Sequence, residues 1–232
     1  MHQTYIIELL NAERIIEMDS YELFIEKLGI NFDDFLEFGI ENTIYPDQDR
    51  IAEFWEELKN RITSGKTVYV RGLGRNGNGN EILKDFYSHF GINVEIDPTN
   101  NAIPQRNLQH FTSLIRNQNL FNYQVAHIFG CTKNVYMFES PWNVCFVPKL
   151  IDPLTGHESK GKFSDEYKKR WLKGIIQKHK TFIDDYNHLI DDFDIDGKLS
   201  VFLADDLIKQ KYTKEQLDSF KKNITKEFVK IE

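Results

Sequence analysis

Cysteine is scarce in this sequence, and long apolar runs are absent from it. Two cysteines, Cys131 and Cys145, occur among 232 residues and form no CxxC pair, which argues against a disulfide framework and a four-ligand structural zinc site. No run approaches the ~18 to 20 consecutive apolar residues of a transmembrane helix. The first residues also lack the basic flank and the small-residue cleavage site of a secretory signal. We therefore expect a cytoplasmic protein without membrane spans, whose fold depends on packing.

The charge is distributed unevenly along the chain. Hydrophobic residues make up 41% of the sequence, which is enough to fill a core. The formal net charge is -7, but residues 1–60 carry 15 acidic and 4 basic side chains, whereas residues 61–180 carry 9 and 17. A basic middle is compatible with a phosphate-binding centre, and it is equally expected if long helices simply differ in surface charge.

The periodicity of apolar residues predicts mostly helices. Spacings of three and four predict helices in the first 64 residues, with Ser20 and Asn31 as N-caps. Residues 67–97 then read as strand, loop, helix and strand, and a helix from about Gln105 to Asn117 should follow. Two strands, "NYQVAHIF" and "WNVCFVP", are joined by a loop of about a dozen residues. A long helix capped by Ser164 and two more helices, near 202–210 and 213–229, complete the prediction.

The strongest local pattern lies between residues 122 and 161. His127 ends an apolar strand, Asn143 follows 16 residues later at the start of the second strand, and His157 comes 14 residues after that, in "DPLTGH". Histidine, asparagine and histidine in this order, on strand, strand and then a turn or helix, resemble the HNH family of nucleases, also called ββα-metal or His-Me finger nucleases. The resemblance implies a mainly helical α+β fold with a central ββα-metal finger.

The expected division of the chain has four segments. Residues 1–66 form an acidic helical region, 67–120 an α/β segment with a glycine-rich loop, 121–165 the HNH-like core, and 166–232 the C-terminal helices.

The resemblance also implies an activity, which is metal-dependent endonucleolytic hydrolysis of phosphodiester bonds in DNA, with RNA left open. His127 would be the general base, because a histidine with a pKa near 6.5 can accept a proton at cellular pH. Asn143 would brace the loop that orients the base. His157 would ligate the metal, and Asp152, nine residues after Asn143, is a rival ligand. These donors suit Mg²⁺ or Mn²⁺ better than zinc.

Basic residues occur where contacts to a phosphate backbone would need them, although "KKR" near a helix start is also an ordinary solvated cluster. The predicted nucleic-acid-binding residues are Arg71, Arg75, Lys133, Lys149, Lys160, Lys162, Lys168, Lys169 and Arg170. Cutting both strands with one site per chain would call for a homodimer. A restriction or other defence role follows from the family analogy alone.

Three other interpretations stay open. Gly72, Gly74 and Gly77 have the GxGxxG spacing of an NAD- or FAD-binding loop, with Asp97 at the end of the next strand. The finger could also survive only as the scaffold of a non-catalytic nucleic-acid-binding or interaction module. The segment "DFDIDGKLS" opens like an EF-hand loop but lacks its final glutamate, so an acidic turn is the favoured interpretation.

Overall fold

Capping side chains determine where the N-terminal helices begin. A computed structural model describes residues 18–73, 79–156 and 159–232. It begins with α2 (Ser20–Leu28), α3 (Phe32–Glu41) and α4 (Gln48–Thr63). Asn31 caps α3 as predicted, but the Asp19 side chain, and not Ser20, caps α2. Asp19 accepts from the Tyr21 N–H at 2.9 Å, which corrects the prediction by one residue.

The second segment contains the predicted strand, helix and strand. They are β1 (Val68–Val70), α5 (Asn80–His89) and β2 (Val94–Ile96), and β1 pairs with β2 in parallel. The next helix, α6 (Ala102–Thr112), lies nearer the N-terminus than the predicted range from Gln105 to Asn117. The buried Asp97 carboxylate accepts from the N–H groups at the start of this helix. Pro104 is tolerated in the first turn, because backbone nitrogens there have no intrahelical acceptor and the missing N–H of proline costs no hydrogen bond.

The predicted strand pair forms a β-hairpin with a long connection. Strands β3 (Tyr123–His127) and β4 (Val144–Pro148) are antiparallel, with His127 opposite Val144. A short helix, α7 (Asp152–Thr155), follows β4. The helix α8 (Lys162–Lys178) begins before Ser164, which is buried inside it, so the prediction of a serine cap is wrong.

The C-terminal half is divided more finely than the sequence predicts. His179 separates α8 from α9 (Lys180–Phe193). The remaining helices are α10 (Ile195–Ala204), α11 (Asp206–Lys211) and α12 (Lys214–Thr225). Asp194 occupies the left-handed region and caps α10 by accepting from the Gly197 N–H at 3.1 Å. The segment that opens like an EF-hand loop is therefore a helix-to-helix junction.

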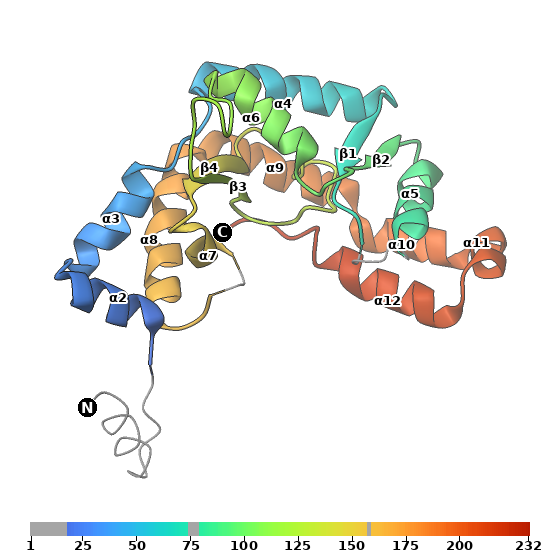
Figure 1. Ribbon diagram of the computed structural model, residues 1–232. Coiled ribbons are helices and arrows are strands. Elements are labelled where there is room, and N and C mark those ends of the chain that lie inside the picture. The colour runs from blue at the N-terminus through green and yellow to red at the C-terminus, as the bar shows by residue number, and fades with distance from the viewer. Residues whose placement is uncertain (1–17, 74–78, 157–158) are drawn as a thin grey trace, which may run out of the picture.

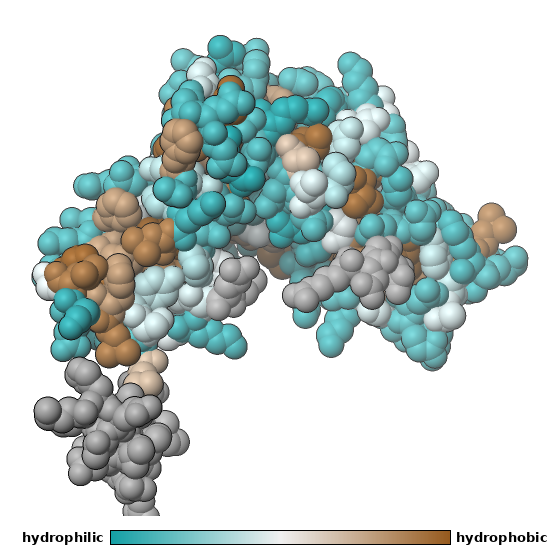
Figure 2. Space-filling view, viewed as in Figure 1, coloured by the Kyte–Doolittle hydropathy of each residue, from teal (hydrophilic) through white to brown (hydrophobic). Residues whose placement is uncertain are grey.

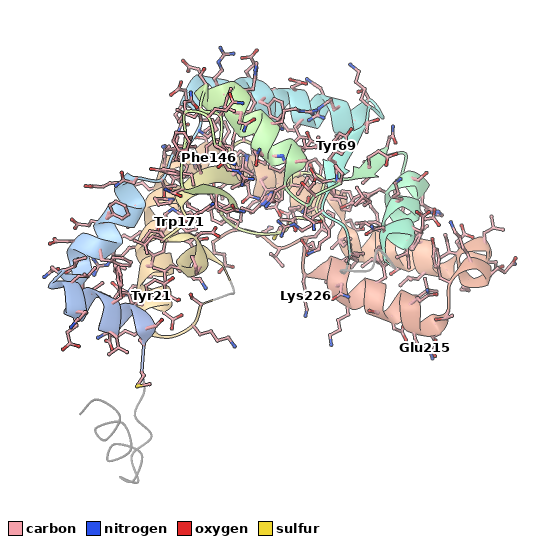
Figure 3. All side chains as sticks on the ribbon, in the orientation of Figure 1. Tyr21, Tyr69, Phe146, Trp171, Glu215 and Lys226 are labelled. Carbon is pink, nitrogen blue, oxygen red and sulfur yellow. The ribbon has the colours of Figure 1, made fainter. Side chains whose placement is uncertain are left out.

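Two groups of helices flank the β3–β4 hairpin, as Figure 1 shows: α2, α3, α7 and α8 on one side, and α5, α10, α11 and α12 on the other. Trp142 follows the loop of the hairpin and packs edge-on against Trp55 of α4 and Tyr186 of α9, in the largest hydrophobic core. A second core joins Trp171 of α8 (Figure 3) to residues of β3 and β4. The loop of the hairpin thus packs in the first core, whereas its strands pack in the second and against α6 in a third.

The surface of α2 has an exposed apolar area. Exposed apolar side chains, including Leu23, Phe24 and Leu28, gather on α2, where Figure 2 shows a brown area. Within the described ranges, no helix is both long and apolar enough to span a bilayer.

Candidate active site

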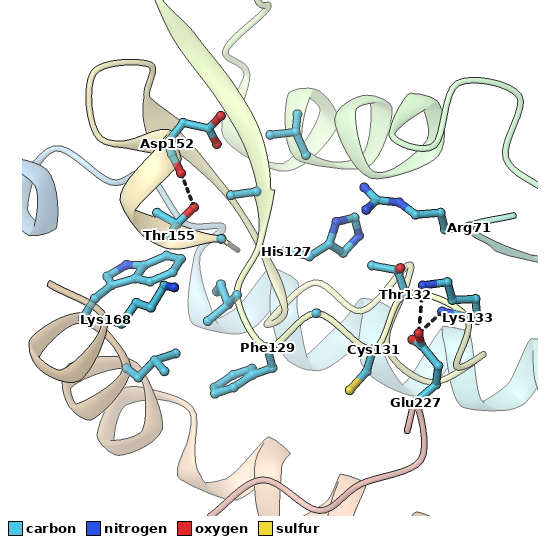
Figure 4. A pocket seen from close by; sticks show the side chains of 17 residues that line it. Arg71, His127, Phe129, Cys131, Thr132, Lys133, Asp152, Thr155, Lys168 and Glu227 are labelled. Carbon is cyan, nitrogen blue, oxygen red and sulfur yellow. Dashed lines mark hydrogen bonds and ion pairs between the residues drawn. The ribbon is translucent and has the colours of Figure 1, made fainter. Parts of the chain in front are cut away.

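A cavity of about 610 Å³ lies against the end of β3, and five of the predicted site residues line it: His127, Asp152, Arg71, Lys133 and Lys168. Figure 2 shows the molecule hollowed between the two groups of helices, and Figure 4 shows the lining from close by. The end of β3, the loop after it, α7 and α8 contribute, together with Arg71, which follows β1, and Glu227 of the C-terminal segment. The cavity is therefore assembled from segments that are far apart in the sequence.

The His127 ring has one nitrogen fixed and the other left as a base. Its Nε2 lies 3.1 Å from the carbonyl oxygen of Phe138, and the ring stacks on the Phe138 ring at 5.2 Å. A carbonyl oxygen only accepts hydrogen bonds, so Nε2 carries the proton. In the neutral imidazole, Nδ1 then holds a lone pair. This is the tautomer that a general base needs.

Burial holds this ring in the neutral form. Desolvation, followed by the positive charge of Arg71, lowers the pKa of His127 to about 3. The pKa of the folded ring therefore lies below the ordinary histidine value near 6.5. The ring is unprotonated at neutral pH, which keeps Nδ1 available, but a low pKa also makes it a weak base toward free water.

Asn143 holds the loop that presents the Phe138 carbonyl. Its side chain is fully buried, and Nδ2 donates to the carbonyl oxygens of Met137 at 2.9 Å and Gly130 at 3.2 Å. Its Oδ1 accepts from the Phe129 N–H at 2.9 Å. One amide side chain therefore ties together both ends of the 128–143 segment.

A buried ion pair ties the same loop to the α/β segment. Glu139 is 2% exposed and receives Arg61 of α4 at 2.8 Å and the Tyr69 N–H of β1 at 2.6 Å. Since Glu139 follows Phe138 directly, this pair fixes the backbone that carries the His127 partner. No sequence motif pointed to Glu139 or Arg61.

Three of the predicted basic residues line the cavity: Arg71, Lys133 and Lys168. Figure 4 shows Arg71 beside the His127 ring and Lys168 on the opposite wall. The Arg71 guanidinium is held by the Asn101 side chain at 2.9 Å and by the Asn100 carbonyl. The geometry thus provides an anchored cation next to the imidazole.

The other predicted basic residues are not part of this lining. Arg170 pairs with Asp33 and Glu166, each at 2.8 Å, so its guanidinium serves helix packing. Lys162 lies over the Phe32 ring. Lys149, Lys160 and Lys169 are exposed. Arg75 lies outside the described residues, as does the predicted metal ligand His157.

Asp152, the rival metal ligand, lines the same cavity as His127. It is the first residue of α7, and three residues separate it from the end of β4. Among residues 18–73, 79–156 and 159–232, no three His, Cys, Asp or Glu side chains form a metal-binding group. Magnesium in proteins usually keeps several waters and takes one or two carboxylates, so Asp152 fits such an ion as its carboxylate.

Sequence reasoning missed Glu227, which also lines the cavity. Its carboxylate accepts from the Lys133 N–H at 3.0 Å and from Lys133 Nζ at 2.8 Å. Glu227 is separated from Lys133 by 94 residues and follows α12 in a segment without a motif. No local pattern could have brought it to the site.

The structure bears on the dinucleotide interpretation and on the reactivity of a thiol in the cavity lining. The Asp97 carboxylate is 3% exposed and accepts from the N–H groups of Thr99, Ala102 and Ile103. It caps α6 and is not open to a ribose, which weighs against the dinucleotide interpretation; Gly74 and Gly77 lie outside the described residues. The pKa of Cys131 is raised by burial to about 11, so this thiol is no activated nucleophile.

Comparison with known proteins identifies the family of this chain. A family model described as "Uncharacterised protein PM1201" matches residues 46–232, a range that contains every described lining residue of the cavity. The uncharacterized protein PM1201 of Pasteurella multocida (strain Pm70) is 39% identical over 177 residues, which cover 75% of this chain and 80% of that protein. No solved structure matches the chain. The chain therefore belongs to the uncharacterised PM1201 family.

Proposed function

We propose that this protein is a metal-dependent endonuclease of the HNH type that hydrolyses phosphodiester bonds in DNA. The observation that carries the proposal is the Nε2 hydrogen bond from His127 to the Phe138 carbonyl. It leaves Nδ1 as the acceptor, in a cavity that also contains Arg71 and Asp152. The β3–β4 hairpin, its loop tied by Asn143, and α7 correspond to the ββα-metal finger.

The residues would divide the reaction as follows. The His127 Nδ1 takes a proton from the attacking water, and the Phe138 carbonyl stabilises the ring as it becomes positive. Arg71 faces the negative charge that grows on the phosphoryl oxygens. A divalent cation, probed first as Mg²⁺ or Mn²⁺, would be held by Asp152 and would lower the pKa of water and stabilise the leaving oxygen. This acidification matters because the His127 ring is a weak base.

Cutting both strands of a duplex with one such site requires two copies of the chain, so the proposal includes a homodimer. The proposed biological role is restriction or another form of defence, and its support is the resemblance to the HNH family alone.

Plasmid cleavage tests this function directly. The wild-type chain should nick or cut plasmid with Mg²⁺ or Mn²⁺, and a chelator should stop the reaction. His127→Ala should lose cleavage while its circular dichroism and DNA binding stay unchanged. His188→Ala is the matched control, because His188 is an exposed histidine of α9 outside the cavity lining. Cleavage by His127→Ala at the wild-type rate would refute the assigned base.

A further inference from the structure

Lys133 presents two donors to a single anionic group. Its backbone N–H and its Nζ lie 3.0 and 2.8 Å from the two different carboxylate oxygens of Glu227, as the dashed lines in Figure 4 show. A main-chain N–H combined with an ammonium is a donor set that suits a phosphate as well as a carboxylate. Both residues line the cavity that contains His127.

The Glu227 carboxylate is held there by a firmly anchored segment. The Glu227 carbonyl accepts from Asn134 Nδ2 at 3.0 Å, and the Val229 carbonyl accepts from the Tyr186 hydroxyl at 3.0 Å. Between them, the buried Phe228 stacks on Phe193 at 4.5 Å. The backbone around Glu227 is thus fixed, while its side chain is 14% exposed, so displacement of the carboxylate would require rotation of the side chain alone.

Lys133 lies close to Arg71 in the fold. Arg71, which neighbours the His127 ring, donates its backbone N–H to the Thr132 carbonyl at 2.8 Å, so the two cations are on directly connected backbone. Phosphates that follow one another along a strand need cations at adjacent positions. A strand with one phosphate at Arg71 would therefore bring a neighbouring phosphate toward Lys133.

We propose that Lys133 forms a phosphate-binding position for the DNA backbone, and that the Glu227 carboxylate occupies it until DNA displaces that side chain. This inference rests on the proposed function for its ligand. Glu227 then lowers the affinity for DNA in general and makes binding depend on a competition between two anions. Removing its charge should strengthen binding.

The test compares Glu227→Gln with wild type. Glutamine keeps an oxygen acceptor for the Lys133 N–H but removes the charge. The control is Glu95→Gln, which breaks the 2.8 Å pair between Lys84 and Glu95 on β2, outside the cavity lining, and changes the net charge equally. Affinity for a fluorescent 16-base-pair duplex is measured by anisotropy in chelator, over a series of salt concentrations.

Glu227→Gln should bind the duplex about three- to tenfold more tightly than wild type. The slope of log affinity against log salt should steepen by about 0.9, since one more phosphate is neutralised. Adding Lys133→Gln should abolish the gain. An equal gain in Glu95→Gln would show a net-charge effect and overturn the inference, as would unchanged or weaker binding by a folded Glu227→Gln.

A second probe separates this inference from the proposed function. Pyrophosphate is titrated while the Lys133 amide is followed by NMR, which requires no cleavage and no DNA. If neither form binds DNA, the endonuclease proposal fails. A Lys133 amide shift with pyrophosphate in Glu227→Gln, absent from Glu95→Gln, would still support the phosphate position, and no shift in either variant would overturn it.

Discussion

Asn143→Asp should destabilise the fold strongly, although it changes one group for another of the same shape. The substitution replaces an amide that donates to the Met137 and Gly130 carbonyls, at 2.9 and 3.2 Å, by an oxygen that can only accept. Two buried hydrogen bonds are lost, and three acceptors then face one another without water. At about 1 kcal/mol for each bond and 1 to 3 kcal/mol for unsatisfied groups, we expect a loss of about 3 to 5 kcal/mol at pH 7.

The deficit should shrink as the pH falls. Burial and the two carbonyl dipoles raise the pKa of the introduced carboxyl above its unfolded value near 3.9. Its folded form therefore binds a proton more readily than its unfolded form, so this group becomes less destabilising below its folded pKa. Each pH unit in that range recovers up to about 1.4 kcal/mol. The protonated carboxyl can donate one of the two lost bonds.

Urea unfolding of wild type and Asn143→Asp, at pH 7 and at pH 5, measures this difference directly. Asn93→Asp is the control, because Asn93 is exposed and donates at 3.0 Å to the Thr67 hydroxyl. The control should stay within about 0.5 kcal/mol of wild type. A loss below 1 kcal/mol at pH 7 in Asn143→Asp, or a deficit that does not depend on pH, would contradict the brace described for Asn143.

Three further predictions use the same unfolding assay. Burial lowers the pKa of His179 to about 4. As the pH falls from 6.5 to 4, wild type should therefore lose about 1.4 kcal/mol of unfolding free energy per pH unit relative to His179→Gln. A difference that stays constant over this range would count against the lowered pKa. Arg61→Met leaves the Glu139 charge buried without its partner and should cost about 3 to 5 kcal/mol; a loss under 1 kcal/mol would mean that the pair does not hold the loop. Gly39→Ala places a Cβ 2.7 Å from a buried tyrosine ring of α8 and should lower the free energy of unfolding by about 1 to 3 kcal/mol. Its control is Gly174→Ala, which has open space around the new Cβ and should stabilise the fold by up to about 1 kcal/mol. Equal effects of the two substitutions would contradict the close packing at Gly39.

The sequence predicted the elements whose signals are local. Alternation of apolar residues located β3 and β4, and Asn31 marked the start of α3, because strand periodicity and capping involve neighbouring residues only. His127 ends β3 and Asn143 directly precedes β4, close to the strand ends where the same local pattern had put them. What periodicity did not show was the break at His179, since the helical pattern of α8 continues through it into α9.

The remaining features of the site depend on contacts between distant segments. The pKa of His127 is set by burial and by Arg71, which is placed beside it by β1. Glu139 and Glu227 look like surface carboxylates in the sequence, and only the folded chain brings them to Arg61 and Lys133. The amide partners of Asp97 at the start of α6 are likewise distant enough in the sequence to escape a spacing rule.

The connection between β3 and β4 also has a kinetic consequence. Its Glu139 pairs with Arg61, which precedes the hairpin in the sequence. Its Asn134 donates to Tyr186 and to the Glu227 carbonyl, which lie 52 and 93 residues later. Closing such long loops costs conformational entropy, and the hydrogen bonds and ion pair that offset this cost form only after the loops have closed. The hairpin can thus pair early, whereas the ring of His127 should reach its working orientation among the last events of folding. Refolding followed at that ring should lag behind the recovery of helical signal.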